Sequence, residues 1–299
     1  MRLISEHRSL TRALPLLAGV LGSRYFERVR AVYSTLGTET GRIILNTPPL
    51  QQASTDIILS VREGFQASAG FVLVAADYSQ VELRLLAHFA ADSDLISAFE
   101  QGIDVFRAIA ERWLRTPQTS ITDAQRNQVK QICYALIYGA GPALVVEQAG
   151  VALEEAQRMM QDFLRSFPGI QKFLSRTKKR CRKQGFVQTL LGRRRYLGDI
   201  RCEDRKRRAR AERQAVNTLC QGSAADLIKV LYAVSSVSVL TSLLKCVCCW
   251  QVHDELIFEV RPSDVLRVAE VVRECMEGAV ALRVPLQVKL SVGPSWGEL

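Results

Sequence analysis

Two apolar runs of strand length lead into acidic residues. Residues 71–76 (Phe-Val-Leu-Val-Ala-Ala) are continuously apolar, which predicts a buried strand. The spacing then changes, because Glu82 and Arg84 are interleaved with leucines at helical intervals, and residues 81–89 are expected to form a helix. Asp77 therefore falls where a strand gives way to a helix.

A second pair of short β-rich runs, residues 247–251 and 256–260, is separated by His253-Asp254-Glu255. This arrangement predicts a tight hairpin with Asp254 at its tip. A helix is expected to follow at 263–282, and another β-rich run at 286–292.

The remaining segments are mostly of helical pattern. Residues 1–35 mix Leu, Ala and Arg at helical spacing, and helical patterns dominate from 104 to 173. Residues 185–197 resemble a hairpin-like loop centred on Gly192, and 204–234 predict one or two helices that change from basic to apolar.

Positive charge is concentrated in one part of the chain. The 299 residues carry a net charge of +10, and residues 172–213 alone hold 17 Lys and Arg against four acidic residues. A solvated helical face normally interleaves the two signs, so contact with phosphates explains this run better, although a solvated face stays the alternative.

Cysteine usage and hydropathy restrict the compartment. Eight cysteines lie without the paired spacing of a zinc site or the density of a disulfide scaffold, which indicates a reducing compartment. We expect the cluster at Cys246, Cys248 and Cys249 to be small buried side chains. No apolar run reaches the roughly 18 residues that span a bilayer, so no membrane partner is expected.

Asp77 and Asp254 are candidate metal ligands. Taken separately, each has an ordinary explanation, since Asp77 could cap a helix N-terminus and Asp254 could be a common turn residue. A site for two cations, however, needs carboxylates from separate backbone segments, and these two acids could supply them.

A third motif combines cations and aromatics at spacings of four: Arg126, Lys130, Tyr134 and Tyr138. On a helix these side chains form one slowly drifting stripe. The cations would suit the phosphates of a nucleoside triphosphate and the aromatics its base and sugar, whereas an amphipathic core helix is the alternative.

These three motifs, in this order, resemble motifs A, B and C of the family A DNA polymerases, which are related to bacterial polymerase I. The resemblance covers nearly the whole chain. Further stretches similar to the family are Thr40-Gly41-Arg42, residues 189–196, Glu212-Arg213 with Asn217, and residues 221–226. Residues 104–106, 130–134, 185–188 and 295–299 look most like the theta branch, and Ala135 with residues 139–141 leans towards the nu branch.

The resemblance assigns roles residue by residue. It implies that two Mg²⁺ ions are held by Asp77, Asp254 and the carbonyl of Tyr78, with Glu255 beside them. It assigns deoxynucleoside triphosphate binding to Gln80, Glu82, Arg126, Lys130, Tyr134 and Tyr138. Lys130 would also neutralise charge that develops on the triphosphate, and Glu82 would exclude a 2′-hydroxyl. It assigns primer-template DNA binding to Arg42, Arg213, Asn217, Gln221 and His253.

The implied fold is α+β, a polymerase palm built on an antiparallel sheet with a helical fingers insert. The expected division is a thumb remnant at 1–41, palm at 42–97, fingers at 98–212 and palm again at 213–299, with the thumb mostly missing. The chain is therefore expected to be a fragment or a reduced form, either a monomer or part of a larger polypeptide.

The implied activity is DNA-templated DNA synthesis by two-metal phosphoryl transfer, in repair by end joining or gap filling. The expected location is the nucleus if the theta-like residues reflect a eukaryotic source, and the cytoplasm otherwise. Two alternatives stay open, a catalytically weak or silent DNA-binding fragment and a single-subunit RNA polymerase; Glu82 argues against the second. Phe106 stands where many bacterial members carry a phosphate-binding histidine.

Overall fold

The computed structural model describes residues 11, 14–22, 24–25, 28–47, 61–138, 141–236 and 247–299. The chain forms two compact units, and each is interrupted in sequence. Unit 1 consists of Met1–Ser79, Leu227–Ala279 and Gln287–Leu299. Unit 2 consists of Gln80–Asp226 and Val280–Leu286.

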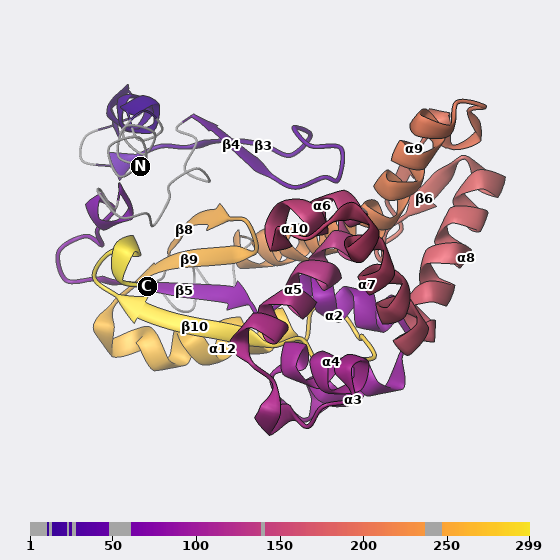
Figure 1. Ribbon diagram of the computed structural model, residues 1–299. Coiled ribbons are helices and arrows are strands. Elements are labelled where there is room, and N and C mark those ends of the chain that lie inside the picture. The colour runs from indigo at the N-terminus through magenta and orange to yellow at the C-terminus, as the bar shows by residue number, and fades with distance from the viewer. Residues whose placement is uncertain are drawn as a thin grey trace. The chain divides into compact units, whose positions relative to one another are not determined.

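Unit 1 is built on a four-stranded antiparallel sheet in the order β10-β5-β9-β8 (Figure 1). Its strands are β5 (Val72–Tyr78), β8 (Val247–Val252), β9 (Glu255–Val260) and β10 (Val288–Gly293). β5 is a central strand, because it pairs with β10 on one side and with β9 on the other. Its apolar residues are correspondingly buried. The predicted strand and hairpin are both present, and β5 runs two residues further than expected, through Asp77 and Tyr78.

One face of this sheet packs into an apolar core. Alternate residues Leu73 and Ala75 of β5 join Ile257 of β9 and the buried Trp296 there. The helix α12 (Val265–Glu277) also packs on β5 and β10, and it ends five residues earlier than predicted because Gly278 follows it. The same strand thus carries core residues at one end and Asp77 at the other.

The helical pattern expected over residues 1–35 is only partly confirmed by the described residues. Residues 14–22 are helical, but three short strands follow within 24–34, and β3 pairs with β4. These strands contain Tyr25, Val29, Val32 and Tyr33, which are β-branched or aromatic and favour extended backbone. Their bounds are β1 (Arg24–Tyr25), β2 (Arg28–Val29), β3 (Val32–Ser34) and β4 (Ile44–Thr47).

Unit 2 is mainly helical and has its own large apolar core. Its first helices are α2 (Val81–Ala90), α3 (Ser93–Glu100), α4 (Val105–Leu114), α5 (Asp123–Ile137), α6 (Pro142–Ala149), α7 (Leu153–Ser166) and α8 (Pro168–Gln184). Phe163 and Phe167 are completely buried there, and Pro168 begins α8 at a position where its missing N–H is harmless.

The predicted hairpin-like loop is the pair β6 (Phe186–Gln188) and β7 (Arg194–Tyr196). The long basic-to-apolar segment forms α9 (Arg205–Asn217) and α10 (Ser223–Ser236). They are joined by a π-helical turn, Thr218–Gly222, which the sequence pattern did not predict. Such turns are frequent at functional sites.

The predicted α+β class is confirmed by the antiparallel sheet of unit 1 and the helices of unit 2. The division into thumb, palm and fingers stays a prediction. Within the described residues, no helix is long and apolar enough to cross a membrane. Cys246 lies outside the described residues, as do the side chains of Cys248 and Cys249.

Candidate functional site

Two acidic residues face each other across neighbouring strands of unit 1. Asp77 of β5 is directly opposite Glu255 of β9, and Lys289 of β10 is opposite Asp77 on the other side. Directly opposite residues point to the same face of a sheet, where like charges destabilise the pairing. This cross-strand pair of carboxylates therefore destabilises the sheet. The flanking Lys289 offsets the repulsion between them only in part.

The electrostatics of these carboxyl groups agree with that crowding. Burial, together with the charges of Glu255 and Asp254, raises the pKa of Asp77 to about 7, against the lowering influence of Lys289. Burial also raises the pKa of Asp254, although Arg42 and His253 oppose the shift. For Glu255, burial again raises the pKa, opposed chiefly by Arg62. Burial thus disfavours the charged form of all three carboxyl groups, and the charges of the other two add to this for Asp77. A cation beside them would favour their ionised forms.

The hairpin tip holds one residue in an unusual backbone conformation. Val252 pairs with Glu255, so that only His253 and Asp254 form the turn between β8 and β9. His253 has a φ of 52°, in the left-handed region where glycine is the usual residue. Strain of this kind persists only when the surroundings enforce it and is common at functional sites.

Arg42 and Tyr78 are also in unit 1. Arg42 is close enough to Asp254 to influence its carboxyl electrostatically. The Tyr78 hydroxyl donates a hydrogen bond of 2.6 Å to the Met276 carbonyl, which anchors β5 to α12. Its amide N–H contacts the Asp254 carbonyl at 3.4 Å. The Tyr78 side chain is therefore occupied by packing, and only its backbone is available for another role.

Gln80 and Glu82 begin α2 in unit 2. Gln80 stands at the N-cap position with a φ of 55° and makes no side-chain cap hydrogen bond. Gln80, and not Asp77, thus has the cap position, which removes the helix-cap explanation of Asp77. Glu82 is 5% exposed and raises the pKa of the buried Cys220 thiol further above its ordinary value than burial alone does. This proximity places Glu82 near the π-helical turn.

The predicted stripe of cations and aromatics lies on α5. Lys130 is exposed, Arg126 and Tyr134 are half-buried, and Tyr138 follows the last residue of the helix and is 37% exposed. The rings of Tyr134 and Tyr138 stack at 5.9 Å between centroids. Val129 and Ile132, which lie on α5 outside the stripe, are completely buried. Tyr134 also packs against this core, so the core explanation applies to Tyr134 in part, but not to the exposed Lys130 and Tyr138.

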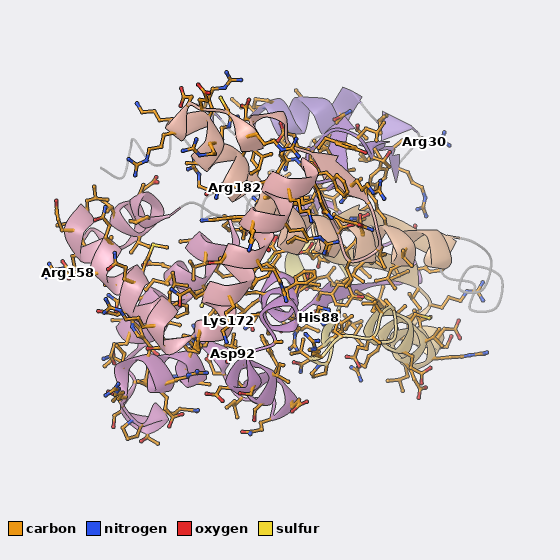
Figure 2. The ribbon with its side chains drawn as sticks, turned by 90° about the vertical axis from the view of Figure 1, so that its right-hand side faces the viewer. Arg30, His88, Asp92, Arg158, Lys172 and Arg182 are labelled. Atoms are coloured by element: carbon orange, nitrogen blue, oxygen red, sulfur yellow. The ribbon has the colours of Figure 1, made fainter. Side chains whose placement is uncertain are left out.

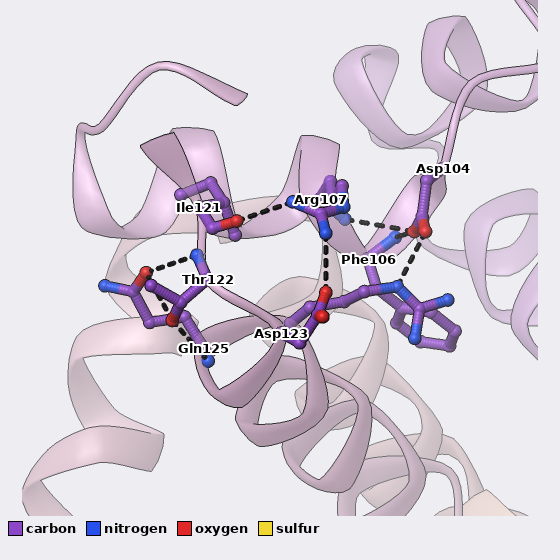
Figure 3. Close-up of polar contacts among 8 residues, drawn as sticks. Asp104, Phe106, Arg107, Ile121, Thr122, Asp123 and Gln125 are labelled. Carbon is purple, nitrogen blue, oxygen red and sulfur yellow. Dashed lines mark hydrogen bonds and ion pairs between the residues drawn. The ribbon is translucent and has the colours of Figure 1, made fainter. Parts of the chain in front are cut away.

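Arg126 has a defined partner within unit 2. Its Nε donates a 2.6 Å hydrogen bond to the Asp104 carboxylate, and its guanidinium lies 5.4 Å from the centre of the Phe106 ring. Asp104 also caps α4 by accepting from the amides of Phe106 and Arg107 (Figure 3). Burial opposes ionisation of Asp104, but these donors outweigh it and lower its pKa. Arg126 is held in place by a charged carboxylate.

The last candidates lie on α9 and the π-helical turn. Arg213 is exposed, while Asn217 and Gln221 are half-buried. The Asn217 Oδ1 atom is buried without a hydrogen-bond partner in the described part of the chain. An amide oxygen in that state is costly unless a ligand group reaches it.

A model of known sequences, described as DNA polymerase family A, matches residues 1–298. The chain belongs to DNA polymerase family A. The chain is 38% identical over 275 residues to DNA polymerase I of Chloroflexus aurantiacus, a match that covers 91% of this chain and 29% of that protein. It is 39% identical over 278 residues to DNA polymerase theta of Mus musculus, a match that covers 81% of this chain and 11% of that protein. The chain thus spans between about a tenth and a third of these two relatives.

A solved structure is also similar to this family A chain. It is the POL domain of Pol1 from M. smegmatis in complex with DNA primer-template and dNTP. The TM-score is 0.90 at 35% identity, over 98% of this chain and 52% of that one. The two structures therefore share the fold over nearly the whole of this chain.

Each unit of the family A chain brings together some of the predicted residues. Unit 1 contains Asp77, Tyr78, Asp254, Glu255, His253 and Arg42, and unit 2 contains Gln80, Glu82, Arg126, Lys130, Tyr134, Tyr138, Arg213, Asn217 and Gln221. Within the described residues there is no group of three or more His, Cys, Asp or Glu side chains arranged to hold a metal. The donors themselves fit Mg²⁺, because carboxylate and carbonyl oxygens are the ligands it takes.

Two residues beside these sites were not predicted to belong to them. Lys289 is opposite Asp77 in the sheet, and Asp104 holds Arg126. Lys289 has no local sequence signal, because it reaches Asp77 only through strand pairing across more than 200 residues. Asp104 lies within the theta-like stretch 104–106, but that likeness assigned it no role. Asp104 does show the spacing of a helix cap, but not the identity of its cationic partner.

Proposed function

We propose that this chain carries a DNA-templated DNA polymerase activity that adds deoxynucleotides to a primer 3′-hydroxyl. Membership of family A supports the proposal, and so does the similar M. smegmatis domain, whose structure holds DNA primer-template and dNTP. The observation within this chain that carries it is the set of buried carboxyl groups at Asp77, Asp254 and Glu255. Burial first, and then the charges of Glu255 and Asp254, raises the pKa of Asp77 to about 7. Such a cluster gains most from divalent cations.

The carboxylates of Asp77 and Asp254 and the carbonyl of Tyr78 would hold two Mg²⁺ ions. Bound Mg²⁺ supplies charge that favours ionisation of the primer hydroxyl and offsets the charge on the triphosphate. Asp77 lies on a central strand and Asp254 in a two-residue turn, so both carboxylates sit on rigid supports. Glu255 adds negative charge beside them, which strengthens the attraction for cations.

Residues of α2 and α5 would bind the deoxynucleoside triphosphate. Lys130 and Arg126 would neutralise the phosphates, and the stacked Tyr134 and Tyr138 would offer aromatic surface to the base and sugar. The buried Glu82 would close the space that a 2′-hydroxyl needs, with Gln80 next to it in the chain.

Five polar residues would bind the primer-template. Arg42 and His253 of unit 1 would contact the DNA near the growing end, and so would Arg213, Asn217 and Gln221 of unit 2. Hydrogen-bond donors of this kind suit minor-groove acceptors, which are present at every base pair, so that pairing geometry is tested without reading sequence. The unpartnered Asn217 Oδ1 is an acceptor, so it would instead take a donor of the DNA, such as the amino group of guanine in the minor groove.

The similarity to DNA polymerase theta supports a role in DNA repair, by end joining or gap filling. The basic segment of α8 and α9 favours a second candidate, a DNA-binding fragment with little or no catalysis.

Primer extension decides between the two. The chain is incubated with a labelled primer-template, deoxynucleotides and Mg²⁺, next to Asp254→Asn and the control Glu270→Gln on the exposed side of α12. We expect extension by the wild type and the control, a loss of at least about a thousandfold in Asp254→Asn, and DNA binding by all three. Binding without extension by the wild type would instead establish the silent fragment.

A further inference from the structure

The cations of α9 fall into two groups. Arg207 forms an ion pair with Asp199 at 2.6 Å, and Arg208 donates to the backbone carbonyl of Cys202. Glu212, the only acidic residue of α9, pairs with Lys178 and Arg182 of the adjacent α8. These interactions connect α9 to its neighbours within unit 2; Arg182 of α8 is labelled in Figure 2. The remaining cations of α9 take no part in them.

The other cations of α9 are Arg205, Lys206, Arg210 and Arg213, all of them exposed, and three of the four lie in one row. Lys206, Arg210 and Arg213 are spaced by four and three residues, which puts them on one face of the helix, and Asn217 continues the row four residues later. All three cations are exposed, and within the described part of the chain their side chains make no hydrogen bond or ion pair. We call Lys206, Arg210 and Arg213 the α9 stripe.

The α9 stripe does not stabilise its own helix. Like charges three and four residues apart repel one another, and cations in the first turns oppose the helix dipole. A solvated face would be expected to interleave acids among the cations, yet the one acid of α9 is turned towards α8. The stripe is therefore better explained by an anionic partner outside the chain.

We propose that Lys206 and Arg210 extend the DNA contact beyond Arg213 and Asn217, as a track for successive backbone phosphates of one strand. The inference rests on the proposed function, because it starts from Arg213 and Asn217 as DNA contacts. From Lys206 to Arg213 the helix rises about 10 Å, which matches about three phosphates of one DNA strand. The phosphates belong either to the primer-template duplex or to the single-stranded template tail.

The test compares two double variants by the salt dependence of DNA binding. Lys206→Gln with Arg210→Gln removes two cations of the α9 stripe and is called the track variant. Arg267→Gln with Arg273→Gln is the control, since it removes two exposed cations of α12, outside the basic run 172–213. Binding of a blunt duplex and of a duplex with a 5′ template tail is measured by fluorescence anisotropy from 50 to 200 mM salt. Thermal melting verifies that both variants fold.

We expect the slope of log affinity against log salt to flatten in the track variant, by about 1.8 for duplex phosphates and about 1.4 for single-stranded ones. Its loss of affinity should be roughly tenfold larger at 50 mM salt than at 200 mM salt. A loss with both DNAs assigns the phosphates to the duplex, and a loss with the tailed DNA alone assigns them to the tail. The control slope should stay unchanged.

Equal slopes for the track variant and its control would overturn the inference, whether both change or neither does. The outcome is separable from that of the proposed function. Extension rate at saturating primer-template should be unaffected in the track variant, whereas absence of extension by the wild type would count against the polymerase activity and leave the slope comparison valid.

Discussion

At the scale of single residues, His253 has a backbone conformation that the turn requires but that is unfavourable for a residue with a Cβ atom. Its φ of 52° costs a residue with a Cβ atom about 1 kcal/mol. We expect His253→Gly to raise the free energy of unfolding by about 0.5 to 1 kcal/mol and at the same time to weaken binding of the primer terminus. Urea unfolding and primer-template affinity measure the two effects.

His253→Ala is the matched variant for this prediction. It also removes the imidazole but keeps a Cβ atom in the left-handed region, so it should weaken DNA binding as His253→Gly does while lowering stability. Equal stability changes in the two variants would contradict the strain argument, and unchanged DNA affinity in both would remove His253 from the proposed DNA contacts.

Glu259 is a residue whose charge supports the fold of unit 1. Burial tends to raise its pKa, but the Ser68 amide at 2.7 Å and the Arg28 guanidinium at 2.9 Å outweigh burial and lower the pKa below the ordinary 4.5. A lowered pKa in the folded state gives stability that is present above pH 4.5 and is lost as the pH falls through the folded value.

We therefore expect the free energy of unfolding to fall between pH 5 and pH 3 more steeply in the wild type than in Glu259→Gln. At pH 7 the variant should be less stable by about 1 to 2 kcal/mol, since it weakens hydrogen bonds to a charged group. Denaturant unfolding at several pH values measures this, and parallel pH profiles of the two proteins would refute it.

Single residues also show what the sequence could predict. Asp77, Asp254 and the α5 stripe are marked by local patterns, and the structure places each in the predicted type of element. Lys289 is not marked, and the likeness of residues 104–106 to the theta branch gave Asp104 no role, because the partners of both residues are set by packing. The positive φ of Gln80 and His253 was likewise unexpected, since both residues usually avoid it.

At the scale of elements, α4 and α5 are joined by the contact between Asp104 and Arg126. Asp104→Asn retains an N-cap acceptor for α4 but removes the charge that competes with a triphosphate for Arg126. Loss of this partly exposed ion pair should lower the free energy of unfolding by about 0.4 to 1 kcal/mol. We expect the KM for deoxynucleotide to fall by two- to fivefold, which corresponds to the same free energy. Steady-state extension kinetics measure KM and kcat separately.

The opposite result, a raised KM, would mean that Asp104 orients Arg126 for the triphosphate and does not compete with it. Arg112 and Asp94 form the control pair on the neighbouring helices, with a 2.6 Å contact and no proposed role in nucleotide binding. Asp94→Asn should leave KM unchanged.

Elements were predicted well where their pattern was long and regular. The apolar runs of β5 and β9 and the helical spacing of α2 and α5 were visible because burial on one side repeats at a fixed period. The strands within 24–34 were missed because they are two or three residues long, too short for any period to appear. The π-helical turn was missed because nothing in its composition distinguishes it from a helix.

At the scale of the whole molecule, the sheet topology was the property that the sequence predicted least. The sheet order β10-β5-β9-β8 pairs the strand that carries Asp77 with two strands about 180 and 210 residues later. Composition and spacing do not specify such pairings; the family resemblance implied an antiparallel sheet, but only the structure gives the register that sets Asp77 opposite Glu255.

The stability of the whole chain should report cation binding without any catalysis. A ligand that binds only the folded state raises the free energy of unfolding by about 2.7 kcal/mol at a hundred times its dissociation constant, or about 3 to 6 °C in Tm for a chain of this size. We expect Mg²⁺ to raise Tm by this order in the wild type, and EDTA to reverse the change. Asp254→Asn removes one proposed ligand and should abolish most of the shift, whereas Glu270→Gln should preserve it. An equal Mg²⁺ shift in all three proteins would show that the cations act elsewhere on the chain, and would withdraw Asp254 from the proposed ligands whatever its effect on primer extension.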